Sequence, residues 1–125
     1  GHIGFTPQYF KKFKIQGNLE KDRKKLLEQA SKNQEAGVFS IVLECINAST
    51  AREITKSLKI PTIGIGASIH CDGQILVTDD MLGLSGFYPK FVKKFVNLNN
   101  IIEIGIKEYR KAVINKKFPN KKNTF

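Results

Sequence analysis

The chain has 125 residues, of which 41% are hydrophobic, and this is enough to form one packed domain of ordinary size. This composition excludes a wholly disordered chain. The net charge is +10, and most of the basic excess lies after residue 86.

No apolar run approaches the roughly 20 residues that a membrane-spanning helix needs. Residues 1–10 lack the basic start and apolar stretch of a signal peptide. Cys45 and Cys71 have the spacing of neither a metal site, a redox pair nor a disulfide framework. We therefore expect a cytoplasmic protein that does not associate with membranes.

The clustered lysines could in principle neutralise the phosphates of a nucleic acid. Only Arg23, Arg52 and Arg110 are arginines, however, and no DNA- or RNA-binding motif is present. We expect solvated helix faces, which disfavours nucleic acid as a partner. A small basic binding module, for example for RNA, stays open as an alternative.

In chain order, the first regular element expected is a helix over residues 19–36. Asn18 can cap its first turn, and Gly37 can close it in the left-handed conformation. Its apolar stripe consists of Leu19, Leu26, Leu27 and Ala30.

A nearly continuous apolar run at 38–44 predicts a strand that is covered on both faces. Thr50 and Glu53 have the spacing of a capping box, which predicts a helix over 50–58. A second short buried strand is expected at 62–66. Together these elements form a β–α–β unit, which predicts a parallel sheet and an α/β fold.

The last third of the chain is expected to hold one more strand and two helices. A turn at Asp72 and Gly73 precedes the strand, at 74–78. Pro89 suits the first turn of a helix over 89–97. Apolar residues at helical spacing predict the last helix, over 100–115.

Glu44 is the strongest candidate for a catalytic residue. It follows the apolar run directly, so it lies at the carboxyl end of a buried strand, where α/β folds build their active sites. A carboxylate that is partly shielded from water there suits a general base. A glutamate that simply reaches solvent at a strand end is the structural alternative.

His2 stands in the run Gly-His-Ile-Gly at residues 1–4 and could donate a hydrogen bond to a substrate oxygen or shuttle a proton. An ordinary loop histidine is the alternative. Gly64 and Gly66 lack the further residues of a nucleotide-binding loop and instead favour close approach of a ligand or neighbouring segment. For the loop aspartates, we favour turn-forming and capping roles over a cation site. These are Asp72, Asp79 and Asp80.

Eight segments, in collinear order, resemble the ketopantoate hydroxymethyltransferase family. The most specific are residues 1–8, Gly-His-Ile-Gly-Phe-Thr-Pro-Gln, and residues 41–45, Ile-Val-Leu-Glu-Cys. The others are residues 13–17, 36–39, 60–67, 71–77, 80–84 and 89–93.

The resemblance implies the C-terminal half of a (β/α)8 barrel related to the phosphoenolpyruvate-binding superfamily. The half barrel would span residues 1–118, followed by a flexible tail at 119–125. The family's metal-binding residues belong to its N-terminal half, so no metal ligand is assigned in this chain. The chain is therefore expected to be one part of a larger fold and inactive by itself.

The resemblance also implies the reaction. A hydroxymethyl group passes from 5,10-methylenetetrahydrofolate to 3-methyl-2-oxobutanoate, giving 2-dehydropantoate for pantothenate biosynthesis, with Mg²⁺ as cofactor. Glu44 would be the base that removes the C3 proton, and His2 would contact the substrate. The complete enzyme would be a homo-oligomer. An oxo-acid lyase of the same superfamily is the remaining alternative.

Three departures from the family pattern lie near the expected mouth of the active site. The stretch 9–13 is shortened, Lys12 and Phe13 replace a common glycine pair, and Asn18 replaces a usual arginine.

Overall fold

The computed structural model describes residues 1–6 and 14–125, so the shortened stretch at 9–13 lies outside the described residues. The described chain forms two compact units. The first comprises residues 1–76 with 89–92, and the second comprises 77–88 with 93–125. No helix among the described residues is long and apolar enough to cross a membrane.

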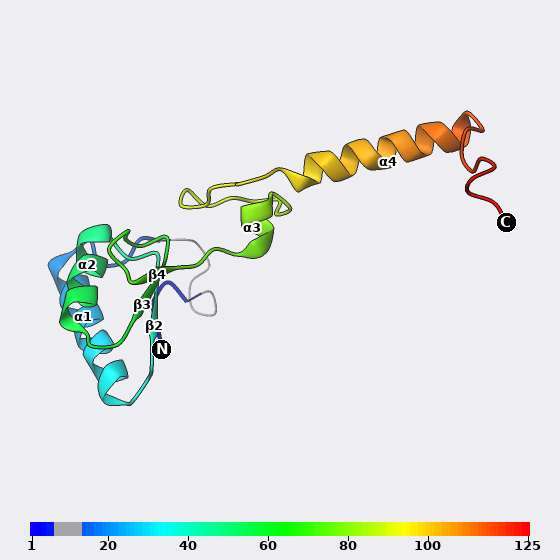
Figure 1. Ribbon diagram of the computed structural model, residues 1–125. Coiled ribbons are helices and arrows are strands. Elements are labelled where there is room, and N and C mark those ends of the chain that lie inside the picture. Colours follow the sequence, from blue (N-terminus) through cyan, green and yellow to red (C-terminus); the bar gives the residue numbers. More distant parts are fainter. Residues whose placement is uncertain (7–13) are drawn as a thin grey trace. The chain divides into compact units, whose positions relative to one another are not determined.

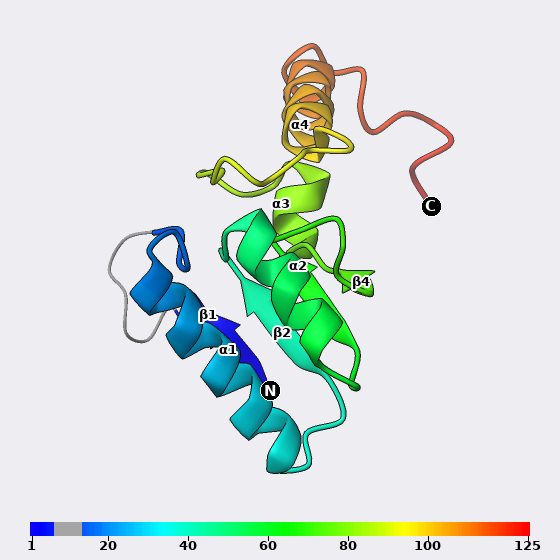
Figure 2. The ribbon, with the colours of Figure 1, turned by 90° about the vertical axis from the view of Figure 1, so that its left-hand side faces the viewer.

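The first unit contains a parallel four-stranded sheet in sequential order, β1-β2-β3-β4. Its strands are β1 (His2–Gly4), β2 (Ile41–Glu44), β3 (Thr62–Ile65) and β4 (Gly73–Gln74). Helix α1 (Glu20–Glu35) connects β1 to β2, and α2 (Ala48–Ser57) connects β2 to β3. Figures 1 and 2 show both helices on the same face of the sheet. The predicted α/β class and parallel sheet are confirmed.

The core lies between the sheet and these two helices. Alternation along β2 turns Ile41 and Leu43, both 0% exposed, toward the helices. Glu44 and Val42 consequently lie on the opposite face of the strand. The core cluster comprises Ile3, Leu26, Ala30, Ile41, Leu43, Ile46, Ala51, Ile54 and Cys71. Full burial of one such aliphatic side chain contributes about 1.5–3 kcal/mol.

The N-cap residues of α1 and α2 differ from those predicted from the sequence. Leu19 occupies the N-cap of α1 without a side-chain bond, while Asn18 Oδ1 accepts a hydrogen bond from Asn47 Nδ2 instead. Asn47 caps α2, and the hydroxyl of buried Thr50 donates to the carbonyl of Gly17. The predicted capping box is therefore wrong, because tertiary contacts outcompeted the local pattern.

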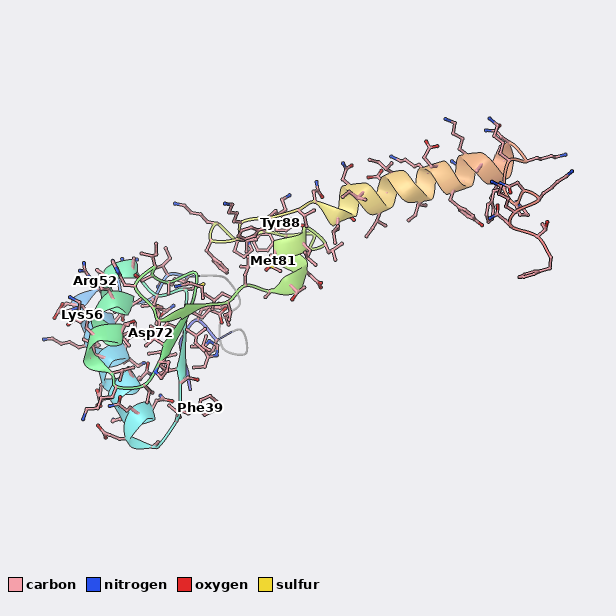
Figure 3. All side chains as sticks on the ribbon, in the orientation of Figure 1. Phe39, Arg52, Lys56, Asp72, Met81 and Tyr88 are labelled. Carbon is pink, nitrogen blue, oxygen red and sulfur yellow. The ribbon has the colours of Figure 1, made fainter. Side chains whose placement is uncertain are left out.

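The end of α1 is as predicted. Ala36 is its C-cap and Gly37 follows with φ +87°, the left-handed conformation that glycine tolerates. The next segment carries Phe39, whose side chain is 88% exposed and labelled in Figure 3. The strand expected from residue 38 begins only at Ile41.

The second unit contains α3 (Thr78–Leu82) and α4 (Leu98–Ile114). Met81 and Tyr88 mark this unit in Figure 3. The backbone N–H of Phe95 donates to the carbonyl of Met81, and Lys94 Nζ lies 4.5 Å from the centre of the Tyr88 ring. Helix α4 agrees with the prediction of 100–115, but none of its residues is buried.

Two predictions for this part of the chain are wrong. The helix expected over 89–97 is absent, because Pro89 begins a turn in which its carbonyl accepts the N–H of Val92. The strand expected at 74–78 ends at Gln74, and Thr78 begins α3.

Candidate active site

Glu44 is the last residue of β2, as its position after the apolar run predicted. Strand pairing places it between Gly4 of β1 and Ile65 of β3. Its side chain is 15% exposed, so the carboxylate is reachable from solvent but largely shielded. This is the position in which parallel sheets carry reactive groups.

His2 and Glu44 are brought together by the pairing of β1 with β2. His2 Nε2 lies 3.1 Å from Glu44 Oε2, and the imidazole side chain is 38% exposed. His2 is paired with Val42, two residues before Glu44, so the two side chains share one face of the sheet. A carboxylate and an imidazole at this distance can exchange a proton or jointly hold a polar ligand.

Cys45, the residue after Glu44, does not act as a nucleophile. Burial, together with the negative charge of Glu44, raises the pKa of the Cys45 thiol to about 11. The reactive thiolate is therefore scarce at neutral pH. Cys45 instead packs as a small buried residue that is 5% exposed.

The glycines at the end of β3 accommodate neighbouring side chains. A Cβ atom on Gly64 would lie 2.9 Å from Gln74 Oε1 and 3.1 Å from Cys71 Sγ. A Cβ on Gly66, which has φ +61°, would lie 2.7 Å from the Phe91 ring. Close approach of a neighbouring segment, rather than nucleotide binding, accounts for both.

Asp72 has a structural role at the opposite end of the sheet. Its Oδ2 accepts hydrogen bonds from the backbone N–H of Thr62 at 2.8 Å and from the Thr62 hydroxyl at 2.9 Å. These two bonds hold the pKa of Asp72 below its ordinary value of 3.8. His70 is exposed in the preceding turn and contributes its backbone N–H to Ser68 Oγ.

The other two loop aspartates belong to the first turn of α3. Asp80 accepts a hydrogen bond from the Ser85 hydroxyl. Within residues 1–6 and 14–125, no three His, Cys, Asp or Glu side chains converge in a way that could hold a metal ion. The described residues therefore do not fit a magnesium site on their own.

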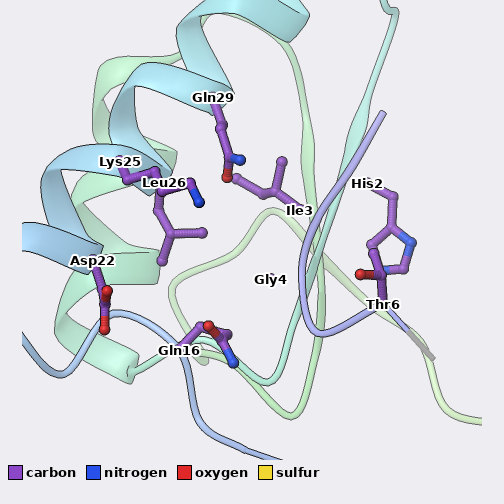
Figure 4. A pocket seen from close by; sticks show the side chains of 9 residues that line it. All are labelled: His2, Ile3, Gly4, Thr6, Gln16, Asp22, Lys25, Leu26 and Gln29. Atoms are coloured by element: carbon purple, nitrogen blue, oxygen red, sulfur yellow. The ribbon is translucent and has the colours of Figure 1, made fainter. Parts of the chain in front are cut away.

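A pocket of about 370 Å³ lies between β1 and α1. Figure 4 shows His2 and Gly4 on one side, with Lys25 and Gln29 of α1 on the other. Glu44 does not line it. The pocket follows the edge of β1 that no other described strand pairs with, so we interpret it as an opening at the edge of the sheet.

Two elements of the site were missed from the sequence. Strand β1 was treated as irregular, because three residues with a histidine and a glycine give no apolar run. Gly4, which has φ +97°, packs directly against the backbone of Glu44. The sequence shows a glycine two residues after His2, but only the pairing of β1 with β2 explains why a glycine is needed there.

The sequence is similar throughout to one protein family. A family model described as Ketopantoate hydroxymethyltransferase matches residues 1–121. Curated relatives named 3-methyl-2-oxobutanoate hydroxymethyltransferase are 49% identical in Pelagibacter ubique and 54% identical in Clostridium botulinum; each alignment covers 100% of this chain. It covers only 49% and 47% of those relatives, so the chain spans about half of their length.

Proposed function

Because the chain belongs to the ketopantoate hydroxymethyltransferase family, we propose that it supplies the catalytic base of that reaction, Glu44, and a substrate-binding histidine, His2. The substrates would be 3-methyl-2-oxobutanoate and 5,10-methylenetetrahydrofolate, and the product 2-dehydropantoate. The observation that carries this proposal is the 3.1 Å contact between the two side chains at the carboxyl end of a parallel sheet.

The proposed chemistry begins with removal of a proton. Glu44 takes the proton from C3 of the oxo-acid, and the electron pair of that C–H bond forms the enolate. The enolate carbon then bonds to the one-carbon unit of the folate. That one-carbon unit is bonded to two folate nitrogens, so two C–N bonds break: one as the C–C bond forms and the other as water supplies the hydroxyl oxygen. The proton taken from C3 and one proton of the water are left on the two nitrogens of the released tetrahydrofolate, which balances the reaction.

The position of His2 suits contact with the oxo-acid. Its ring has a second nitrogen besides the one near Glu44, so it can hold the carboxylate and a substrate oxygen together. The 38% exposure of the side chain leaves room for such a contact. A substrate hydrogen-bonded there would have its reacting carbon near the base.

A (β/α)8 barrel is the proposed architecture of the complete protein, with residues 1–118 as its C-terminal half. The sequential order of four parallel strands supports it, since doubly wound sheets reverse their strand order. The family's Mg²⁺ would supply Lewis-acid assistance to enolate formation. We expect its ligands in the part of the family proteins that this chain does not span, and the 125 residues alone to be inactive.

The test is exchange of the C3 hydrogen of 3-methyl-2-oxobutanoate with deuterated water, followed by NMR without folate. It uses a full-length family protein that carries this segment. We expect Glu44→Gln to slow exchange by about 10²–10⁴-fold, because the amide cannot accept the proton. Glu108→Gln, an exposed change on α4, is the matched control. Exchange by Glu44→Gln at the parent rate would refute the proposed function.

A further inference from the structure

The backbone around Glu44 is held from both neighbouring strands and from the segment after β1. The N–H of Phe5 donates to the carbonyl of Glu44 at 2.8 Å. The N–H of Cys45 donates to the carbonyl of Ile65 at 3.0 Å, and the Cys45 carbonyl accepts from Gln16 at 2.8 Å. These three bonds fix the two peptide groups on either side of Cys45, the first of which contains the carbonyl of Glu44.

Cys45 itself adopts φ +51°, the left-handed conformation that non-glycine residues seldom take. The chain therefore turns sharply at the end of β2 instead of continuing along the strand. A turn of this kind persists only where surrounding contacts hold it. The bonds to Ile65 and Gln16 are such contacts.

Gly4 makes the bond from Phe5 possible. A Cβ atom at residue 4 would lie 2.1 Å from the carbonyl oxygen of Glu44 and 2.7 Å from Ile46 Cγ1. Ordinary contacts of a Cβ begin near 3.4 Å, so residue 4 and the Glu44 peptide would have to separate by about 1.3 Å. The Glu44 carbonyl cannot rotate away without losing its bond to Phe5.

We propose that Gly4 is a positioning residue for the reaction: the absence of a side chain lets β1 close on the carbonyl of Glu44 and so fixes the carboxylate beside His2. This inference rests on the proposed role of Glu44 as the base. Gly4 needs no contact with the substrate, because it acts through the peptide group of the residue that does the chemistry.

The expected effect falls on the rate of the chemical step. Misplacement of a catalytic group by about 1 Å can cost about 10²-fold in rate. We therefore expect Gly4→Ala to lower kcat, and the rate of C3 hydrogen exchange, by about 10²-fold. KM should change much less, because His2 can still hold the oxo-acid.

Gly37→Ala is the matched control. Gly37 also has a left-handed backbone, φ +87°, but a Cβ there would meet nothing within 4 Å. Both variants carry the conformational cost of alanine at positive φ, and only Gly4→Ala adds the collision with Glu44. Loss of stability alone would affect both variants, whereas misplacement of the base would affect only one.

The experiment measures three quantities in the full-length parent and in both variants: C3 exchange, the split between kcat and KM, and amide hydrogen exchange at Phe5. Gly4→Ala should lose rate and lose protection of the Phe5 amide, while Gly37→Ala should keep both. Equal rates in folded Gly4→Ala and Gly37→Ala would overturn the proposal.

Two comparisons separate failure of the positioning role from failure of the proposed function or of folding. If Glu44→Gln exchanges C3 hydrogen at the parent rate, the proposed function has failed. If Glu44→Gln is slow but Gly4→Ala exchanges at the parent rate, the positioning role alone has failed. If Gly4→Ala does not fold, the hydrogen-exchange rate of the Phe5 amide in the parent tests the positioning role instead. Protection of about 10²-fold or more supports the proposal, and exchange at the rate of a free amide overturns it.

Discussion

The two ends of the parallel sheet carry polar side chains with opposite properties. At the carboxyl end of β2, Glu44 contacts the side chain of His2 from β1, and the two side chains remain 15% and 38% exposed. At the amino end, Asp72 accepts the N–H and hydroxyl of Thr62, which is 0% exposed. The Thr62 hydroxyl also lies 2.9 Å from that of Thr55 on α2.

The difference separates groups that can react from groups that hold the fold. Asp72 accepts two hydrogen bonds from Thr62, one from the backbone N–H of Thr62 and one from its hydroxyl. Asp72 therefore holds the start of β3 against the start of β4. The carboxylate of Glu44 contacts the imidazole of His2, whose side chain is 38% exposed and therefore open to a ligand. Substitutions at the carboxyl end should therefore change activity, and those at the amino end should change stability.

The largest effect is expected at Glu44. Glu44→Gln keeps the shape of the side chain and removes its basicity, so kcat should fall by about 10²–10⁴-fold with a smaller change in KM. Steady-state kinetics of the full-length protein, with urea unfolding as a check, measures this. A midpoint of unfolding that falls along with kcat would show that the carboxyl end also stabilises the fold.

A smaller loss of activity is expected for His2→Ala. A hydrogen bond to substrate is lost, but water can partly replace it, so kcat/KM should fall by about tenfold, which corresponds to one hydrogen bond of about 1.4 kcal/mol. His2→Gln, which retains a donor, should recover part of the loss. A fall as large as that of Glu44→Gln would instead give His2 a direct part in proton transfer.

Asp72→Ala should lower the free energy of unfolding by about 1 kcal/mol, because the N–H of Thr62 loses its acceptor. The exposure of Asp72 lets water compensate in part, which keeps the effect small. Urea unfolding measures it, and Asp79→Ala in the first turn of α3 is the control. Activity should stay within about twofold of the parent, as expected for a bond that only holds the fold.

The smallest effect is a dependence on pH. The pKa of Asp72 is lower in the folded protein than its ordinary value of 3.8, so its stabilising contribution is present above that value. The contribution is lost as the pH falls below 3.8 and through the lowered pKa. The stability difference between the parent and Asp72→Ala should therefore shrink between pH 5 and pH 3, measured by urea unfolding. A stability difference between the parent and Asp72→Ala that grows as the pH falls would contradict this prediction.

Much of the first unit could be predicted from sequence patterns. Helices α1 and α2 and strands β2 and β3 were expected within a few residues of their observed bounds. Long apolar stripes and runs mark the residues that become buried, and the burial of these residues largely determines where the four elements form. Helix α4 was found from the helical spacing of its apolar residues, although none of its residues is buried.

The errors lie where local signals are short or compete with tertiary contacts. Pro89 fits a helix start and a turn equally well, and only a turn forms. Thr50 and Glu53 matched a capping box, but Thr50 donates to the carbonyl of Gly17 and Glu53 binds Arg23 of α1. Strand β1 is too short to show a periodicity of its own.

The sequence by itself determined the parallel α/β character, the end of β2 at Glu44 and the resemblance to one enzyme family, because runs of apolar residues and collinear motifs are written along the chain. Only the tertiary structure decided that His2 lies 3.1 Å from Glu44 and that Gly4 must lack a side chain. Both facts depend on the register between β1 and β2, which are separated in sequence by all of α1. Between strands so far apart in sequence, the register is decided when the buried faces pack together and the backbone hydrogen bonds form.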